Sequence, residues 1–224
     1  MKRAVVLLSG GLDSVTCLSV AINEGYEVYP LSFNYSQRHK KELDCAGNAV
    51  NHYGIKTHKI IKMENVGGSA LTDMEIDVPE YKGDSDIPVT YVPARNIIFL
   101  SYAVGYAEVV DAEAIYIGVN AIDYSGYPDC RPEFIEAFEN TIKVGTKSGV
   151  EGNPIKIITP LLHLTKAEII KLAYKNNAPL NLTTSCYKGG EKACGICDSC
   201  ILRLKGFREA GLTDPVEYES GANK

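Results

Sequence analysis

The sequence predicts an α/β fold in which a Rossmann-like parallel sheet carries helices on both faces. Short apolar runs alternate with helix-length amphipathic segments along most of the chain, and a glycine-rich turn directly follows the first run. Such alternation is typical of parallel sheets covered by helices. Four of the seven cysteines crowd into the last fifth of the 224 residues. We therefore expect an α/β domain over residues 1–177 and a small metal-binding region over residues 178–224.

The predicted elements follow one another in the order strand, helix, strand, helix. The strands are the apolar runs Ala4–Leu8, Glu27–Phe33, Thr57–Lys62, Ala114–Val119 and Ile155–Ile158. The helices are the segments Asp13–Asn23, Gln37–Tyr53, Arg95–Val110, Pro132–Thr146 and Lys166–Asn176. In such sheets ligands bind outside the carboxyl ends of the strands, where the first turn lies. The polar stretch 64–92 is predicted to be a long loop near the active site or a mobile lid.

Composition and charge narrow the class of protein. The net charge is -5, whereas proteins that bind nucleic acid usually carry a basic excess, so a nucleic acid is not the expected main partner. No stretch approaches the roughly 18 apolar residues that span a bilayer. The first apolar run is too short for a signal peptide. We expect a cytoplasmic protein without a membrane partner, in which clustered cysteines bind a metal instead of forming disulfides.

The turn Ser9-Gly10-Gly11-Leu12-Asp13-Ser14 joins the first predicted strand to the first helix. Its glycines let backbone amides approach a ligand closely, and the helix N-terminus adds N–H donors and a favourable dipole. The two serine hydroxyls add donors, and Asp13 is a candidate ligand for the Mg²⁺ that accompanies a polyphosphate. A capped glycine-rich turn without a ligand is the alternative. The turn matches neither the Walker A pattern nor Gly-x-Gly-x-x-Gly, which argues against a dinucleotide cofactor.

The clustered cysteines are Cys186, Cys194, Cys197 and Cys200. Together they supply the four thiolates that tetrahedral zinc requires, and four protein ligands leave no open position for catalysis. Their polar neighbours argue against inert buried thiols. An iron–sulfur cluster is the competing interpretation, and the spacing alone does not separate it from zinc.

The turn after the first strand resembles the pyrophosphate loop, or PP-loop, of the ATP pyrophosphatase superfamily, whose fold is adenine nucleotide alpha-hydrolase-like. The resemblance implies that a substrate oxygen attacks the α-phosphate of ATP while the loop holds the departing pyrophosphate. It also implies a nucleotide-binding segment made of Leu8, Ser9, Gly10, Gly11, Leu12, Asp13, Ser14, Val15, Thr16, Cys17 and Leu18.

Further motifs span nearly the whole chain: Asn34–His39, Tyr91–Asn96, Gly118–Asn120, Asp123–Arg131, Thr159–Leu161, Thr165–Glu168 and the cysteine run. Together they resemble the 7-cyano-7-deazaguanine synthase family, and Ser125–Arg131 with the four cysteines is the most specific part. The resemblance implies an ATP-dependent carbon–nitrogen ligase of queuosine biosynthesis. Such an enzyme converts 7-carboxy-7-deazaguanine and ammonia to the nitrile by adenylating first the carboxylate and then the amide. It further implies one structural Zn²⁺ per chain, a homodimer, and a free base rather than tRNA as substrate.

Residue chemistry and the resemblance together suggest roles for individual side chains. The predicted catalytic residues are Ser9, Asp13, Ser14, Arg95 and Lys166, of which the last two would neutralise phosphate charge. The predicted substrate-binding residues are Asp123, Tyr127, Asp129, Arg131 and Arg38. A carboxylate can accept from N–H groups of the base, a tyrosine ring can stack on it, and a guanidinium can hold the substrate carboxylate. The alternative is that these are turn residues and solvated surface charges.

Two other functions remain open from the residues alone. One is a tRNA-sulfurating PP-loop enzyme whose cysteines carry a persulfide or an iron–sulfur cluster. The other is a zinc ribbon that binds RNA while the turn senses a nucleotide. Both require an affinity for tRNA that depends strongly on salt.

Two further side chains are expected to pack rather than to act chemically. Cys17 lies in an apolar run with no identifiable base nearby, which argues against a nucleophile. His163 lies between two leucines and is also expected to pack.

Overall fold

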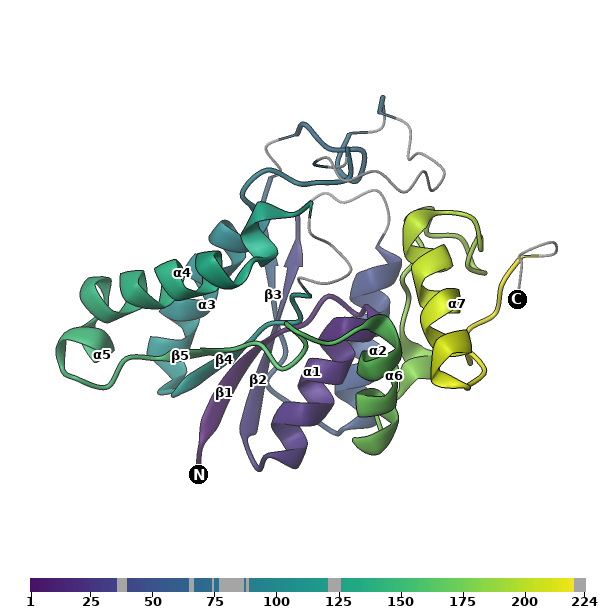
Figure 1. Cartoon of the computed structure of the whole chain (residues 1–224). Helices are drawn as coiled ribbons and strands as arrows, with labels where there is room; N and C mark the ends of the chain where they lie inside the picture. The colour runs from purple at the N-terminus through teal and green to yellow at the C-terminus, as the bar shows by residue number, and fades with distance from the viewer. Residues whose placement is uncertain are drawn as a thin grey trace.

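The computed structural model describes residues 1–35, 40–64, 67–73, 75–76, 87, 89–120 and 126–219. Within these residues five parallel strands form one sheet in the order β3-β2-β1-β4-β5. The strands are β1 (Arg3–Leu7), β2 (Glu27–Asn34), β3 (Lys59–Lys62), β4 (Ala114–Tyr116) and β5 (Lys156–Ile158). Each predicted strand is present, and β4 ends earlier than expected. The central strand β1 therefore ends between the ends of β2 and β4 (Figure 1).

Seven α-helices accompany the sheet in the described part of the chain. They are α1 (Leu12–Asn23), α2 (Lys41–His52), α3 (Arg95–Val110), α4 (Pro132–Gly145), α5 (Lys147–Val150), α6 (Lys166–Lys175) and α7 (Asp198–Ala210). The five predicted helices are confirmed, although the start predicted for α2 at Gln37 lies outside the described residues. The short α5 and the longer α7 were not predicted.

The helices cover both faces of the sheet, because successive side chains of a strand point to opposite sides. Val5 and Leu7 of β1 belong to a hydrophobic cluster with residues of α3 and α4. Ala4 and Val6 belong to a second cluster, with residues of α1 and α2. Figure 1 shows the two layers on either side of the strands. The predicted fold class is therefore confirmed.

The C-terminal region shares a hydrophobic cluster with the α/β domain. Leu12 of α1, Ile169 of α6 and Phe207 of α7 pack in one cluster. The backbone N–H of Thr184 donates to the carbonyl of Gly10 over 3.1 Å, which ties the region directly to the turn after β1. The division at residue 177 remains a prediction. Among the described helices, none is both long and apolar enough to cross a membrane.

Candidate active site

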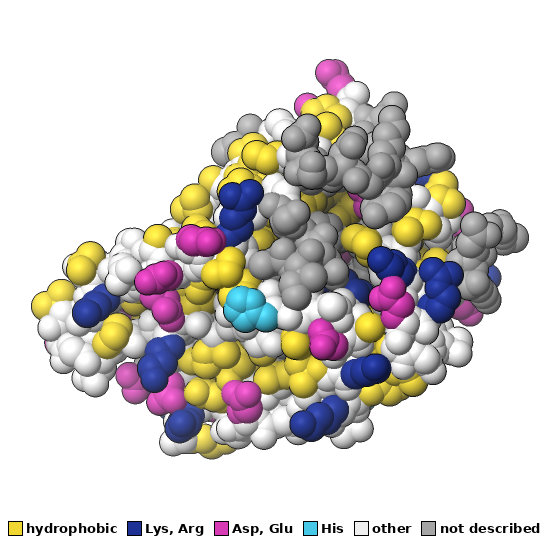
Figure 2. Space-filling model, in the orientation of Figure 1, with side chains coloured by type: hydrophobic (Ala, Val, Ile, Leu, Met, Phe, Trp, Pro, Cys, Tyr) yellow, Lys and Arg dark blue, Asp and Glu magenta, His cyan; other side chains and the backbone are white. Residues whose placement is uncertain are grey.

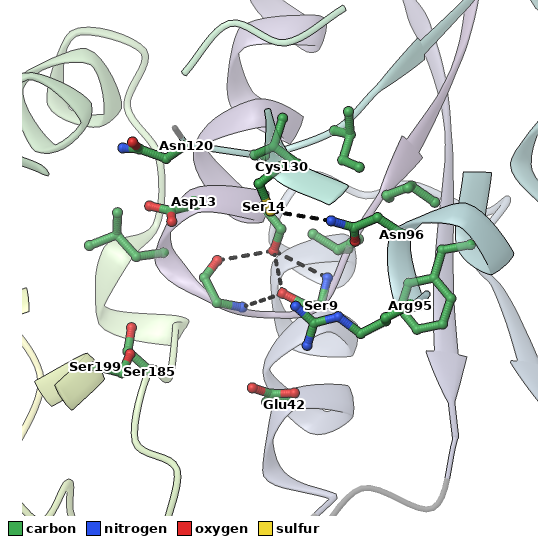
Figure 3. Close-up of a pocket in the computed structure, with 18 of the residues that line it drawn as sticks. Ser9, Asp13, Ser14, Glu42, Arg95, Asn96, Asn120, Cys130, Ser185 and Ser199 are labelled. Carbon is green, nitrogen blue, oxygen red and sulfur yellow. Dashed lines mark hydrogen bonds between the residues drawn. The ribbon is translucent and has the colours of Figure 1, made fainter. Parts of the chain in front are cut away.

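A cavity of about 280 Å³ lies at the carboxyl ends of β1, β2 and β4. Its wall combines the turn after β1, the first turns of α1 and α3, α6 and the C-terminal region (Figure 3). The polar side chains that line it are Ser9, Asp13, Ser14, Tyr35, Glu42, Arg95, Asn96, Asn120, Tyr127, Lys166, Thr184, Ser185, Tyr187, Ser199 and Arg203. All five residues predicted to be catalytic are among them, although they come from positions far apart in the sequence.

The hydroxyl of Ser14 lies at the centre of the turn Ser9–Ser14. The backbone N–H groups of Ser9 and Gly10 point at Ser14 Oγ over 3.1 and 3.2 Å, and Ser9 Oγ donates to it over 3.0 Å. Ser14 Oγ in turn donates to the carbonyl of Gly11 over 3.1 Å. Three donors thus converge on one oxygen next to a helix N-terminus, which is an arrangement that suits a phosphate oxygen.

Gly10 is required by the close approach of α2 to the turn. Its φ is +87°, and a Cβ there would lie 2.0 Å from the carbonyl oxygen of Glu42 and 2.7 Å from the backbone nitrogen of Ala46. Both are backbone atoms of α2, so no side-chain rotation relieves the collision. The packing of α2 therefore holds the N–H groups of the turn in position.

Lys166 and Asp13 form an ion pair at the cavity wall. Lys166 Nζ donates to both carboxylate oxygens of Asp13, over 3.0 and 2.9 Å. A capping box places Lys166 at the first position of α6: Thr165 Oγ1 accepts from the backbone N–H of Glu168, and the Glu168 carboxylate accepts from that of Thr165. Sequence reasoning gave the lysine and the aspartate separate partners, whereas the structure joins them to each other.

Arg95 begins α3 and points into the cavity on the side of Ser9 (Figure 3). Burial alone would lower the pKa of this guanidinium, but the electrostatic interaction and hydrogen bond with Tyr35, followed by the electrostatic interactions with Cys130 and Asp129, outweigh burial and raise the pKa. The side chain therefore stays a cation, as the neutralisation of phosphate charge requires.

Tyr127 and Asp129 have different surroundings, although only one residue separates them. Tyr127 is buried, lines the cavity, and its hydroxyl lies 2.7 Å from Thr90 Oγ1. Burial raises the pKa of this phenol. Asp129 is buried too, but its Oδ2 accepts from the backbone N–H of Asn96 over 2.9 Å, and its side chain is not part of the described cavity wall. The carboxylate thus satisfies a free donor at the start of α3.

Of the remaining predicted substrate-binding residues, the structure describes Asp129 and Arg131, and neither lines the cavity. Arg131 is exposed and precedes α4 as its N-cap residue. Arg38 and Asp123 lie outside the described residues. Their roles toward a substrate stay predictions, as does that of Asp129.

The predicted nucleotide-binding segment divides into two parts. Its cavity-lining members are Leu8, Ser9, Gly11, Leu12, Asp13 and Ser14, while Gly10 between them is buried against α2. The side chains of Val15, Thr16, Cys17 and Leu18 are buried in the core instead. Cys17 packs as predicted, because it is fully buried in a hydrophobic cluster. Burial raises the pKa of its thiol, and the charge of Asp13 raises it further. The same prediction for His163 was wrong, because this side chain is exposed while Leu161 and Leu162 point inward.

Sequence reasoning missed the aromatic side of the cavity. Phe33 at the end of β2 stacks on Phe99 of α3, with ring centroids 3.9 Å apart and planes within 3°. Tyr35 lies edge-on to Phe99, and all three rings line the cavity. The signal was the alternation of Phe33 and Tyr35 at the carboxyl end of a strand, where ligands of such sheets bind.

A second set of missed residues comes from the cysteine region. Ser185 and Tyr187 flank Cys186, and Ser199 precedes Cys200. All three noncysteine side chains line the cavity, and Figure 3 shows both serines on the wall beyond Asp13. The segments that carry the cysteines therefore form one wall of the site.

The four clustered cysteines have the geometry of a metal site. Their sulfurs all lie within 4.8 Å of one another, and Cys194 Sγ lies 3.9 Å from Cys200 Sγ. Four sulfurs around one zinc ion are expected about 3.8 Å apart, given Zn–S bonds of about 2.3 Å. Hydrogen bonds from Cys197 and Cys200 lower the pKa of the Cys186 thiol, and the shared hydrogen bonds with Cys186 raise the pKa of the Cys197 and Cys200 thiols. The thiolate is the form that binds a metal.

Comparisons with known proteins identify the family. The family described as "Queuosine biosynthesis protein QueC" matches residues 3–211. The 7-cyano-7-deazaguanine synthase of Acetivibrio thermocellus is 76% identical over 97% of this chain and 98% of that protein. The 7-cyano-7-deazaguanine synthase 2 of Desulfitobacterium hafniense is 66% identical over 97% of this chain and 94% of that protein. NMN synthetase from Francisella tularensis shares the fold, with a TM-score of 0.51 and 16% identity over 95% of this chain and 78% of that one. As its motifs predict, the chain belongs to the QueC family of queuosine biosynthesis proteins.

Proposed function

We propose that this enzyme converts 7-carboxy-7-deazaguanine and ammonia to 7-cyano-7-deazaguanine at the expense of two ATP. The observation that carries the proposal is one cavity in which the turn Ser9–Ser14, Arg95 and the Lys166–Asp13 pair meet. Converging N–H donors and two cations suit a polyphosphate and the pyrophosphate that leaves it. The choice of substrate is supported by the 76% identity to a protein that carries the name of this activity.

The proposed reaction has two adenylation steps. A carboxylate oxygen attacks the α-phosphate of ATP, and the bond to the β-phosphate breaks so that pyrophosphate leaves with the electron pair. Ammonia then attacks the acyl carbon, loses a proton, and AMP departs to leave the amide. The amide oxygen attacks a second ATP in the same way. Loss of the nitrogen-bound protons and of the second AMP gives the nitrile, so each carboxylate oxygen ends in one AMP.

The residues of the turn would act on the leaving group. When a phosphate oxygen takes the position of Ser14 Oγ, the N–H groups of Ser9 and Gly10 can donate to it. Arg95 and Lys166 would offset the charge that grows on pyrophosphate as the bond breaks, which accelerates the step only if these contacts strengthen in the transition state. Asp13 offers the carboxylate oxygens that Mg²⁺ prefers, and a bound Mg²⁺ would neutralise further phosphate charge.

For the base we propose a ring contact with Tyr127, which lines the cavity and is held by Thr90. Asp123 as acceptor for base N–H groups and Arg38 as partner of the substrate carboxylate rest on residue chemistry and family resemblance. Asp129 would act at one remove, by holding the start of α3 from which Arg95 extends. Arg131 has the weakest support, because its exposed side chain does not line the described cavity wall.

We also propose that the four cysteines hold one structural Zn²⁺. Their sulfurs are close enough to share a single ion, whereas an iron–sulfur cubane places a separate iron beneath each cysteine and spreads the sulfurs further. A persulfide on one of these buried thiols would not reach a tRNA unless the cluster opened, which weighs against the tRNA-sulfurating alternative.

A cytoplasmic homodimer without a tRNA or membrane partner completes the proposal. On the face shown in Figure 2, Lys and Arg side chains are interspersed with Asp and Glu side chains, unlike the basic stripe typical of nucleic-acid-binding proteins. Helix α3 exposes apolar side chains, with Ile97, Tyr102 and Val109 at 44%, 48% and 80% exposure. Apolar side chains gathered on one helix suit a contact with a second copy. Clustered thiols suit a reducing compartment.

Oxygen labelling tests the proposed reaction. The enzyme is incubated with ATP, Mg²⁺, ammonia and substrate labelled with ¹⁸O at both carboxylate oxygens. Two AMP and two pyrophosphate are expected per nitrile, with one ¹⁸O in each AMP. Formation of ADP, or of unlabelled AMP alongside nitrile, contradicts adenylation. A gel-shift assay with tRNA at low salt tests the alternative partner, and no shift is expected.

A further inference from the structure

One buried face of α7 carries both a cysteine of the metal cluster and a glycine that touches the active site. The buried residues of this helix are Cys200, Arg203, Gly206 and Phe207. Their spacing places them on one side of the helix. Phe207 packs in the cluster that contains Ile169 of α6, so this side faces α6 (Figure 1).

Gly206 lies directly against the stem of Lys166. A Cβ at Gly206 would lie 2.5 Å from Lys166 Cγ and 3.0 Å from Lys166 Cβ. The Cδ1 atom of Ile170 would also be 3.0 Å away. Glycine weakens a helix interior relative to alanine, so its presence here needs a reason. The reason is space, because the lysine stem occupies the volume that a side chain would take.

The position of α7 is fixed on both sides of this contact. Cys197 is the N-cap residue of α7 and Cys200 lies in its first turn, and both belong to the four-cysteine cluster. Arg203, one turn before Gly206, is 3% exposed and pairs with Asp214 over 2.7 Å. The helix therefore has little freedom to slide or rotate away from α6.

Lys166 has correspondingly little freedom. Its side chain is 11% exposed and its ammonium group reaches Asp13 over 2.9 Å. A displacement of the stem would move this group away from the turn, and displacements of about 1 Å can cost enzymes roughly a hundredfold in rate.

We propose that Gly206 is a positioning residue for Lys166, and that the cysteine cluster sets the place of this lysine through α7. The role in turnover rests on the proposed function, whereas the contact itself does not. The cysteine region is then part of the adenylation machinery and not only a stabilising appendage.

A double-mutant cycle tests the coupling. Wild type, Gly206→Ala, Lys166→Ala and the double variant are compared in thermal unfolding and in pyrophosphate release with saturating and limiting ATP. Gly206→Ala should lower kcat/KM for ATP by roughly ten- to a hundredfold. When Gly206→Ala is added to Lys166→Ala, kcat/KM should change less than twofold. The unfolding midpoint should also fall less than it does when Gly206→Ala is introduced into wild type. The matched control is Gly47→Ala in α2, where a Cβ meets nothing within 4 Å.

Equal losses on both backgrounds, or full activity of Gly206→Ala, overturn the proposal. If Gly206→Ala does not fold, the double variant decides: it folds if the lysine stem is the obstacle, and its failure to fold refutes the inference. If wild type itself releases no pyrophosphate, the proposed function fails. The unfolding cycle still shows whether the two residues are coupled.

Discussion

The turn Ser9–Ser14 and the four-cysteine region both border the cavity, but different forces hold them in place. The turn is fixed by hydrogen bonds among its own groups and by the backbone of α2. In the cysteine region, four sulfurs lie within 4.8 Å of one another. If several of them were thiolates, their charges would repel one another unless a cation lay among them. One wall of the site thus forms from the chain alone, whereas we expect the other to depend on the proposed metal.

Removal of the proposed zinc is expected to have the largest effect. Structural zinc contributes roughly 10 kcal/mol or more to the folding of zinc-finger peptides. Chelation, or Cys197→Ala, should abolish stoichiometric zinc and lower the unfolding midpoint steeply. Cys45→Ala is the matched control, because Cys45 is buried outside the cluster and should leave the zinc content unchanged. A full complement of zinc in Cys197→Ala would contradict the metal-dependent wall.

The next largest effect is expected inside the same region but without the metal ligands. Arg203 donates to both oxygens of Asp214, over 2.7 and 2.9 Å, and both side chains are buried. Arg203→Met would leave the Asp214 carboxylate without this partner, which should cost about 3–5 kcal/mol. Chemical denaturation measures this loss. The exposed pair of Lys192 and Glu217 is the control, and Lys192→Ala should cost less than about 1 kcal/mol.

The turn itself can be disrupted through Gly10. Both Gly10→Ala and Gly25→Ala force a side chain into positive φ, at +87° and +84°, which costs roughly 1–2 kcal/mol. Only the first also collides with α2, since a Cβ at Gly25 meets nothing within 4 Å. Gly10→Ala should therefore lose about 1–3 kcal/mol more, together with substrate-dependent pyrophosphate release. Equal stability and activity of the two variants would show that α2 does not hold the turn.

The smallest expected effect concerns pH and the start of α6. Hydrogen bonds from Thr165 lower the pKa of the Glu168 carboxyl below its ordinary value near 4.5. The capping box therefore contributes stability above that ordinary value and loses it as the pH falls through the lowered pKa. Midpoints of denaturant-induced unfolding are measured over about 3 pH units below pH 6. They should fall faster with decreasing pH for wild type than for Glu168→Gln. Parallel curves would exclude a contribution from this carboxylate.

The strands and most helices could be predicted because each carries its own local pattern. Helix α7 could not, since its inner face holds Cys200 and the charged Arg203, which interrupt the apolar periodicity that marks a helix. The members of the cavity could be predicted one by one from motifs. Their pairing could not, because Lys166 and Asp13 are 153 residues apart in the sequence and meet only through the packing of α6.

Asp129 illustrates a second limit. A carboxylate in a segment that contains Gly and Pro gives the same sequence pattern whether it binds a ligand or caps a helix. Its partner, the N–H of Asn96, lies 33 residues earlier in the chain, so no local sequence pattern predicts this hydrogen bond. The cysteine cluster was the opposite case, because all four cysteines lie within one short segment.

The ion pair of Lys166 and Asp13 leaves this part of the wall electrically neutral before any nucleotide arrives. A polyphosphate that attracts the lysine leaves the aspartate facing like charge, and a divalent cation between them relieves that repulsion. Anion and cation are then linked thermodynamically, so each raises the affinity for the other by the same factor. The site should accordingly select the metal complex of a nucleotide over the bare nucleotide.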